Sequence, residues 1–364
     1  MAENFGDVFP RLRRFIPSSL LDGPWRGRLE ERVGELPGWL TLNYAAFEFR
    51  LGDPAPAADY FVSVAPGRPS LEYFVRQGED AKPDSPEAAL GRVFARMNGV
   101  APPSEPSLAG WFRASMLEYD IAEVPSDLNP APGVFLALQP ESELDKDVAG
   151  SRTPDRLAAA IANAVGWEED EEERRSVERV FAALPRDGVV DQIGAVAQRE
   201  PRSIRLIMDG LKQRNMPALL KRLKWEGSAR KVMDILEEMR DVTPVFRLAV
   251  DVAADGVGPR LGLEMYRPRK PSNLDYWLTS GRNAWRPVVD YLEEMKWCLP
   301  EKGAGLRAFP GIERLFEEKG MSILYKGINH FKLSIEGDAI EAKAYAALAY
   351  FRLYADSEGE SGQA

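Results

Sequence analysis

Phe246-Arg-Leu-Ala-Val-Asp-Val252, followed after a short turn by Arg260-Leu-Gly-Leu-Glu-Met-Tyr266, alternates apolar and polar side chains. Because successive side chains of a β-strand point to opposite faces, this alternation predicts a hairpin with one apolar face and one polar face. Gly256 and Pro259 between the two stretches are typical turn residues. The polar face would carry cations, carboxylates and a phenol.

A second hairpin with the same alternation follows near the C-terminal end. Its strands are Asn329-His-Phe-Lys-Leu-Ser-Ile335 and Glu341-Ala-Lys-Ala-Tyr345, joined by a turn at 336–338. The period of two places His330, Lys332 and Ser334 on one face of the first strand. Lys343 and Tyr345 share a face of the second strand. Both hairpins therefore predict a polar sheet face rich in donors.

Strand pairs followed by helical sequence recur along the chain. Alternation or strand-forming composition marks residues 40–51, 60–64, 116–122, 133–138 and 203–208, and helical spacing marks 85–97, 153–165, 228–239 and 285–295, the last expected to end before Pro300. Adjacent hairpins with helices between them predict an α+β fold. We expect an antiparallel β-barrel or strongly curved sheet of repeated hairpin units, with helices packed on the outside. One domain over 1–356 and a disordered polar tail over 357–364 are predicted.

Composition limits the function. The chain has 364 residues and a net charge of −10, which argues against nucleic acid as a partner. A single cysteine and a single histidine exclude an intrachain disulfide, a Cys-based zinc site and His-rich metal sites, so no metal site is predicted. No apolar run approaches the roughly 20 residues of a membrane span. We therefore expect a cytoplasmic protein.

The predicted polar face allows two interpretations. Small residues among large donors, such as Ala249 and Gly262, suit the wall of a cavity, and a barrel of about ten strands is wide enough to hold a ligand. Alternatively, the cations simply pair across strands with Asp251, Glu264 and Glu341, as opposite charges on one sheet face tend to do.

The two closing hairpins, the triplet Lys343-Ala-Tyr345 and the repeated hairpin-helix rhythm resemble the aromatic prenyltransferases with the αββα barrel, including the branch that prenylates peptides. The resemblance implies that lysine, arginine and tyrosine side chains on the inner face bind an isoprenoid diphosphate. The matching candidates are Arg205, Arg247, Arg260, Tyr266, Lys332, Lys343 and Tyr345.

The barrel interpretation implies a reaction in which an allylic diphosphate is the donor. Fixed cations would stabilise the departing diphosphate of an allylic donor, and a carboxylate would take the proton of an aromatic small molecule or peptide acceptor. Glu48 and Glu118, on early predicted strands, are the candidate catalytic bases. No tightly bound cofactor is implied. Mg²⁺ is possible but not indicated, since the Asp-rich motif of helical terpene synthases would need an Asp-Asp pair that the sequence lacks.

A second resemblance points to a pathway rather than to a reaction. Ile204-Arg-Leu206, Trp225-Glu-Gly227, Cys298-Leu-Pro300 and Ile328-Asn-His330 are similar to uncharacterised bacterial proteins linked to ribosomal peptide pathways. A prenyltransferase in such a pathway, or in other natural-product tailoring, is the leading hypothesis. The alternatives are a non-catalytic peptide-binding or maturation accessory protein and an enzyme of unrelated chemistry.

Overall fold

The computed structural model describes residues 4–41, 44–100, 107–121, 131–197, 199, 201–267, 284–317 and 320–352. The predicted tail at 357–364 lies outside these residues. The described chain divides into two compact units, and the single domain over 1–356 stays a prediction. No helix of the described part is long and apolar enough to cross a bilayer.

Hydrogen bonding links the described strands in a closed order. From β1 to β8 each strand pairs with the next, β8 pairs with β10, and β11 pairs with both β10 and β1, while β9 pairs with β10 outside this ring. The strands are β1 Ala45–Arg50, β2 Ala58–Val64, β3 Phe112–Tyr119, β4 Gly133–Leu138, β5 Val189–Ala195, β6 Ile204–Asp209, β7 Val245–Ala253, β8 Gly256–Tyr266, β9 Gly311–Glu317, β10 Gly320–Glu336 and β11 Ala339–Arg352. The fold is thus an antiparallel ten-stranded β-barrel with helices, and the predicted α+β class is confirmed.

Helices fill most connections between the strand pairs, as the sequence rhythm predicts. The described α-helices are α1 Phe5–Leu12, α2 Pro24–Val33, α3 Gly38–Thr41, α4 Pro69–Asp80, α5 Pro86–Met97, α6 Lys146–Ser151, α7 Pro154–Ala164, α8 Glu171–Ala183, α9 Met216–Arg222, α10 Ala229–Glu238, α12 Arg286–Glu294 and α13 Pro300–Ala308. Pro300 occupies the first position of α13, where its missing N–H costs no hydrogen bond. The expectation that Pro300 stops the preceding helix was wrong, because α12 already ends at Glu294.

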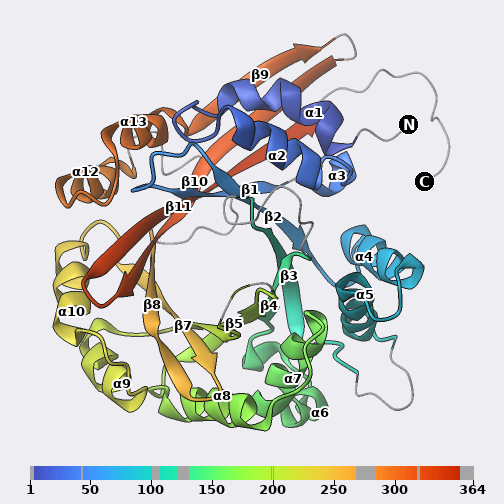
Figure 1. Ribbon diagram of the computed structural model, residues 1–364, viewed down its shortest axis with the longest axis vertical. Helices are drawn as coiled ribbons and strands as arrows, with labels where there is room; N and C mark the ends of the chain where they lie inside the picture. Colours follow the sequence, from blue (N-terminus) through green and yellow to red (C-terminus); the bar gives the residue numbers. More distant parts are fainter. Residues whose placement is uncertain are drawn as a thin grey trace. The chain divides into compact units, whose positions relative to one another are not determined.

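The larger unit comprises Asp59–Pro268 and His330–Lys343. Its sheet curves, and α7, α8, α9 and α10 lie along the convex side (Figure 1). α7 packs on β4, β5 and β6, and α8 packs on β7 and β8. Leu206, Leu248 and Leu263 face these helices and are fully buried. Burial of this apolar face against the helices is the main stabilising contribution to the unit.

The opposite, concave face of this sheet carries charge. Arg247 on β7 lies directly opposite Glu264 on β8, which in turn lies opposite Lys332 on β10. Two residues further along β7, on the same face, Ala249 lies opposite Gly262. The face parity predicted from the two alternating hairpins is therefore confirmed by the register.

The smaller unit comprises Met1–Ala58, Arg269–Asn329 and Ala344–Ala364. Its central polar contact is made by Lys302 of α13, which has no exposed surface. The Lys302 ammonium donates to the carbonyl oxygens of Arg50 at 2.7 Å and Ala55 at 2.6 Å, and so holds the segment that leaves β1. Burial lowers the pKa of Lys302.

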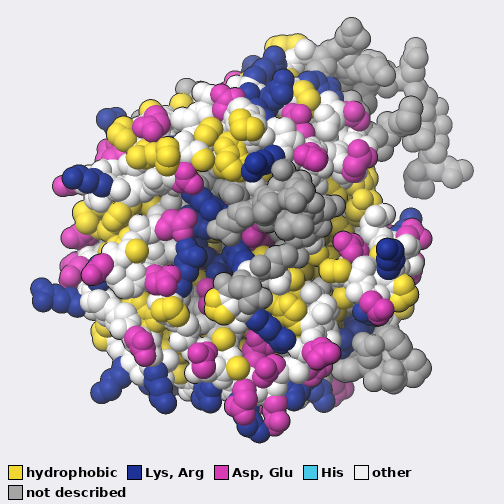
Figure 2. Space-filling model, in the orientation of Figure 1, with side chains coloured by type: hydrophobic (Ala, Val, Ile, Leu, Met, Phe, Trp, Pro, Cys, Tyr) yellow, Lys and Arg dark blue, Asp and Glu magenta, His cyan; other side chains and the backbone are white. Residues whose placement is uncertain are grey.

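Acidic and basic side chains are interspersed over the face of the molecule drawn in Figure 2. Opposite charges at similar spacing largely cancel at distances beyond about 10 Å in physiological salt. Although the chain has a net charge of −10, its acidic residues do not form one continuous patch on this face.

Lys302→Met keeps the aliphatic stem but removes the donor from two buried carbonyls. We expect the free energy of unfolding to fall by about 2–4 kcal/mol, the desolvation cost of the acceptors left without it. Urea unfolding followed by tryptophan fluorescence measures the change. Lys221→Met on the exposed side of α9 is the matched control and should shift the unfolding free energy by less than about 0.5 kcal/mol.

Candidate functional site

A buried arginine lies at the centre of the concave face of the larger unit. The side chain of Arg247 is 3% exposed. Its guanidinium donates to Asp209 at 2.8 Å and contacts Asp191 at 2.8 Å. Burial by itself would lower the pKa of Arg247, but Tyr266 and the surrounding carboxylates, including Glu264, outweigh burial and raise it. Arg247 therefore stays charged and ties β5, β6 and β8 to β7.

Tyr266 and His330 form the aromatic part of this region. The Tyr266 hydroxyl donates to Glu264 at 2.9 Å, and the Tyr266 ring lies 5.2 Å from the Arg247 guanidinium. The rings of Tyr266 and His330 stack with centroids 4.5 Å apart. Burial raises the pKa of Glu264, but His330, Lys332 and Arg247 together lower it below its usual range. Glu264 is therefore an ionised carboxylate held among donors.

Two lysines reach the same face from β10 and β11. The Lys332 ammonium lies 3.8 Å from Glu264, and the Lys343 ammonium lies 3.8 Å from Glu341. Both distances exceed that of a hydrogen bond. The Lys332 stem lies over Gly262, because a Cβ added at Gly262 would stand 2.7 Å from Lys332 Cε. Gly262 thus leaves the space that Lys332 occupies.

Two arginines pair with carboxylates beside them. Arg205 on β6 makes a two-bond pair with Asp251 on β7, at 2.7 and 3.0 Å. Arg260 on β8 donates to Glu341 on β11 and is 41% exposed. Burial raises the pKa of Asp251, but the charge of Arg205 and its hydrogen bonds outweigh burial and lower it. These two pairs are the cross-strand neutralisation that the sequence allowed as an alternative.

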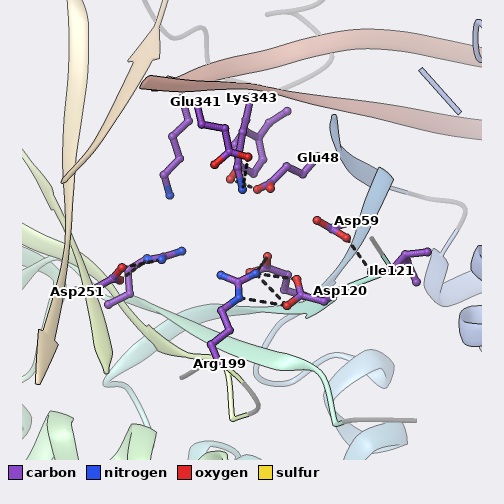
Figure 3. A network of polar contacts seen from close by, with 12 residues as sticks. Glu48, Asp59, Asp120, Ile121, Arg199, Asp251, Glu341 and Lys343 are labelled. Atoms are coloured by element: carbon purple, nitrogen blue, oxygen red, sulfur yellow. Dashed lines mark hydrogen bonds and ion pairs between the residues drawn. The ribbon is translucent and has the colours of Figure 1, made fainter. Parts of the chain in front are cut away.

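A carboxylate cluster lies where β3 ends. Arg199 donates to Glu118 at 2.9 Å. Arg199 also donates to Asp120 at 2.7 Å, and Asp59 accepts the backbone N–H of Ile121 at 2.7 Å (Figure 3). Burial, the charge of Glu118 and that of Asp59 raise the pKa of Asp120 to about 8 against the opposing effect of Arg199. Arg199 thus contacts two neighbouring carboxylates, and the pKa of Asp120 stands well above its usual range.

Glu48 and Tyr345 form a pair in the smaller unit. The Tyr345 hydroxyl donates to the Glu48 carboxylate, which is 2% exposed. A buried carboxylate that accepts from a phenol is held in place by it.

The structure brings most of the predicted residues together. Arg205, Arg247, Arg260, Tyr266, Lys332 and Lys343 lie on neighbouring strands of the larger unit. Glu118 belongs to the same unit, whereas Glu48 and Tyr345 pair with each other in the smaller one. Each of the five predicted cations of the larger unit has a carboxylate within 4 Å.

Several members of the site were not predicted. Asp120 stands two residues after Glu118, a spacing that the period-two argument could have used. Asp191 lies at a register shift between β5 and β6, and Arg199 lies between strands, so neither position follows from periodicity. Within the described ranges, no three His, Cys, Asp or Glu side chains are arranged to hold a metal ion.

Comparisons with known proteins add little at the level of sequence. No family model matches the chain, and no curated protein matches it. The crystal structure of PriB in a binary complex with product diphosphate is similar to it, with a TM-score of 0.49 and 15% identity over 94% of this chain and 96% of that chain. A likeness of this degree assigns no activity.

Replacing Arg247 by methionine should leave Asp191, Asp209 and Glu264 without their shared countercharge. We expect the free energy of unfolding to fall by about 3–5 kcal/mol, as for other broken buried ion pairs. Arg260→Met, at a partly exposed position, should cost at most about 1 kcal/mol. Equal losses in the two variants, measured by urea unfolding, would show that Arg247 is not the central contact.

Asp120 predicts a characteristic pH dependence of stability. The folded chain holds a proton on Asp120 that the unfolded chain releases near pH 4. This contribution to stability is complete below about pH 4 and is lost as pH rises to about 8. Asp120→Asn should therefore flatten the fall in unfolding free energy over this window, whereas the exposed Asp338→Asn should leave the profile unchanged. Parallel profiles for wild type and Asp120→Asn would contradict the assignment.

Proposed function

We propose that the chain is a prenyltransferase that moves an isoprenyl group from an allylic diphosphate to an aromatic or peptide acceptor. The observation that carries the proposal is the array of cations on the concave face of the larger unit. Arg205, Arg247, Lys332 and Lys343 reach this face from adjoining strands, and the hydroxyl of Tyr266 lies among them.

The array suits the chemistry of diphosphate departure. The bond between the allylic carbon and oxygen breaks with its electron pair on the diphosphate, so negative charge grows on the leaving group. Cations held in a buried site stabilise that charge without reorganising. Lys332 and Lys343 are 6% and 7% exposed and stand 3.8 Å from their carboxylates. Both lysines therefore contribute positive charge to a part of the face that is largely shielded from water.

The acceptor half of the reaction needs a base beside an aromatic surface. Glu118 lies directly opposite Phe61 in the β2–β3 register, and Met116 lies opposite Phe135. Aromatic faces attract and shield an allylic cation. As the acceptor atom bonds to the allylic carbon, its proton would pass to Glu118, with Arg199 holding the carboxylate in position. Glu48, held by Tyr345, is the alternative base.

The remaining parts of the proposal concern conditions and setting. The reaction as written needs no tightly bound cofactor, and the dependence of rate on added Mg²⁺ would show whether the ion accompanies the diphosphate. We place the protein in the cytoplasm and in peptide or other natural-product tailoring. Donor chain length and acceptor identity are read from the assay below.

One observation favours a second candidate, a non-catalytic peptide-binding or maturation accessory protein. The cations of the concave face are matched by carboxylates, Asp251, Glu264 and Glu341 among them. A face of alternating charge offers both donors and acceptors, which suits the backbone and termini of a peptide as well as an anion.

The assay combines the protein with dimethylallyl, geranyl or farnesyl diphosphate and with tryptophan, tyrosine or peptides that contain them, with and without Mg²⁺. We expect an isoprenyl mass increment on one acceptor. Lys332→Met and Lys343→Met should each lower the rate by about 10²-fold, the usual cost of one lost donor to developing charge. Lys231→Met is the matched control, since Lys231 contacts only turn carbonyls and Asp338 in its described bonds, and should retain the rate.

The Glu118→Gln variant tests the role of the base independently of diphosphate binding. It should lower transfer by about 10²-fold or more while calorimetric affinity for diphosphate is retained. Glu48→Gln tests the alternative base in the same way. Absence of product with every donor, together with absence of diphosphate binding, would reject the transferase in favour of the accessory protein.

A further inference from the structure

A cavity of about 550 Å³ lies on the helix side of the larger unit, between α5 and α7. α7 packs on the convex side of the sheet, so this cavity is separate from the charged concave face. Its walls are Ala89, Arg92, Val93 and Arg96 of α5, Asp155, Arg156, Ala159, Ala160 and Asn163 of α7, with Leu108, Trp111, Glu169 and Arg174 completing the lining.

The cavity results from the types of residue that α5 and α7 present to each other. Ala89, Arg92, Val93 and Arg96 stand at intervals of three and four, so they share one face of α5. Alanines at the facing positions of α7 leave the space open. The other face of α5 is closed against α4, where a Cβ added at Gly91 would stand 2.7 Å from the Cα of Gly78. The volume lies within the range of small-molecule pockets.

The charge of the lining is positive. Four arginines line the cavity against two carboxylates, Asp155 and Glu169. The Asp155 carboxylate accepts from the Thr153 hydroxyl, which is the first cause of its lowered pKa, and Glu169 pairs with Arg174 at 3.2 Å. Arg96 is 94% buried, since only 6% of its surface is exposed. A concentration of guanidinium groups in a pocket is typical of phosphate and carboxylate recognition.

Two of the four arginines, Arg92 and Arg156, have few donors engaged by the described residues. Arg92 donates one described bond, to the Pro83 carbonyl at 3.0 Å, and Arg156 donates one, to the Ser151 carbonyl at 3.2 Å. A guanidinium has five N–H groups in a fixed plane. Trp111 and Val93 belong to the lining of the same cavity, although each is only 1% exposed. The lining therefore combines charge-assisted donors with a small apolar part that includes an aromatic residue.

We propose that this cavity binds an organic anion, a phosphate or carboxylate attached to an aromatic body. The anionic group would contact the arginines of α5 and α8, and the aromatic body would pack against Trp111 and the alanines. The site stands apart from the cation array of the proposed reaction, so it would act as an effector site, and its existence does not depend on that reaction.

Calorimetric titration of the full chain with four probes tests the proposal. Phenyl phosphate and benzoate carry both parts of the expected ligand, inorganic phosphate carries only the charge, and benzyl alcohol only the ring. We expect binding by phenyl phosphate, by benzoate or by both, at least tenfold tighter than by inorganic phosphate or benzyl alcohol. The stronger of the two aromatic probes identifies the anionic group.

Substitutions in the lining test whether the anion binds in this cavity. Arg92→Gln and Arg174→Gln should each weaken the aromatic anions at least tenfold, and Ala159→Phe, which fills the cavity, should abolish binding. Arg175→Gln is the matched control, because Arg175 lies on the same helix but pairs with Glu171 and Glu172. Lys332→Met on the concave face should also leave the affinity unchanged. Circular dichroism would confirm that each variant is folded.

Two results would overturn the proposal. The first is absence of binding by all four probes at millimolar concentration. The second is binding that Arg92→Gln, Arg174→Gln and Ala159→Phe leave intact while Lys332→Met removes it, which would place the anion on the concave face instead.

Discussion

The buried guanidinium of Arg247 is the contact on which the larger unit depends. It is surrounded by carboxylates from β5, β6 and β8 and by the ring of Tyr266. A charge in this position is tolerable only when its partners are all present, because desolvation costs several kcal/mol for each unpaired ion. The strands around Arg247 are consequently fixed in register by electrostatics on one face and by leucine packing on the other.

This arrangement explains why the concave face is both charged and buried. Glu264 is shared by Arg247, Lys332 and Tyr266, so no single pair is independent of its neighbours. Ionised groups held in a fixed pattern form a preset electrostatic environment. An environment of this kind favours a ligand whose charge changes during reaction, and it equally favours a peptide that presents donors and acceptors in alternation.

The architecture of the face was predictable because strand periodicity is a local property. The alternation in 246–252 and 260–266 placed Arg247, Glu264 and Tyr266 correctly, and Arg205 was assigned to the same group. Which carboxylate each cation contacts depends on register shifts, such as the one beside Asp191, and on loop residues such as Arg199. Those contacts join residues up to 81 positions apart, so the spacing along one strand carries no information about them. The same limit applies to Lys302, whose two acceptors lie about 250 residues earlier in the chain.

The close approach of Gly78 and Gly91 has a consequence for the cavity between α5 and α7. With no Cβ on either residue, the backbones of α4 and α5 touch, and α5 is supported from behind by main chain rather than by side chains that change rotamer. The wall that carries Arg92 and Arg96 is therefore preorganised. A molecule entering the cavity would lose little free energy to ordering the protein, and its affinity would report the fit of the arginines themselves.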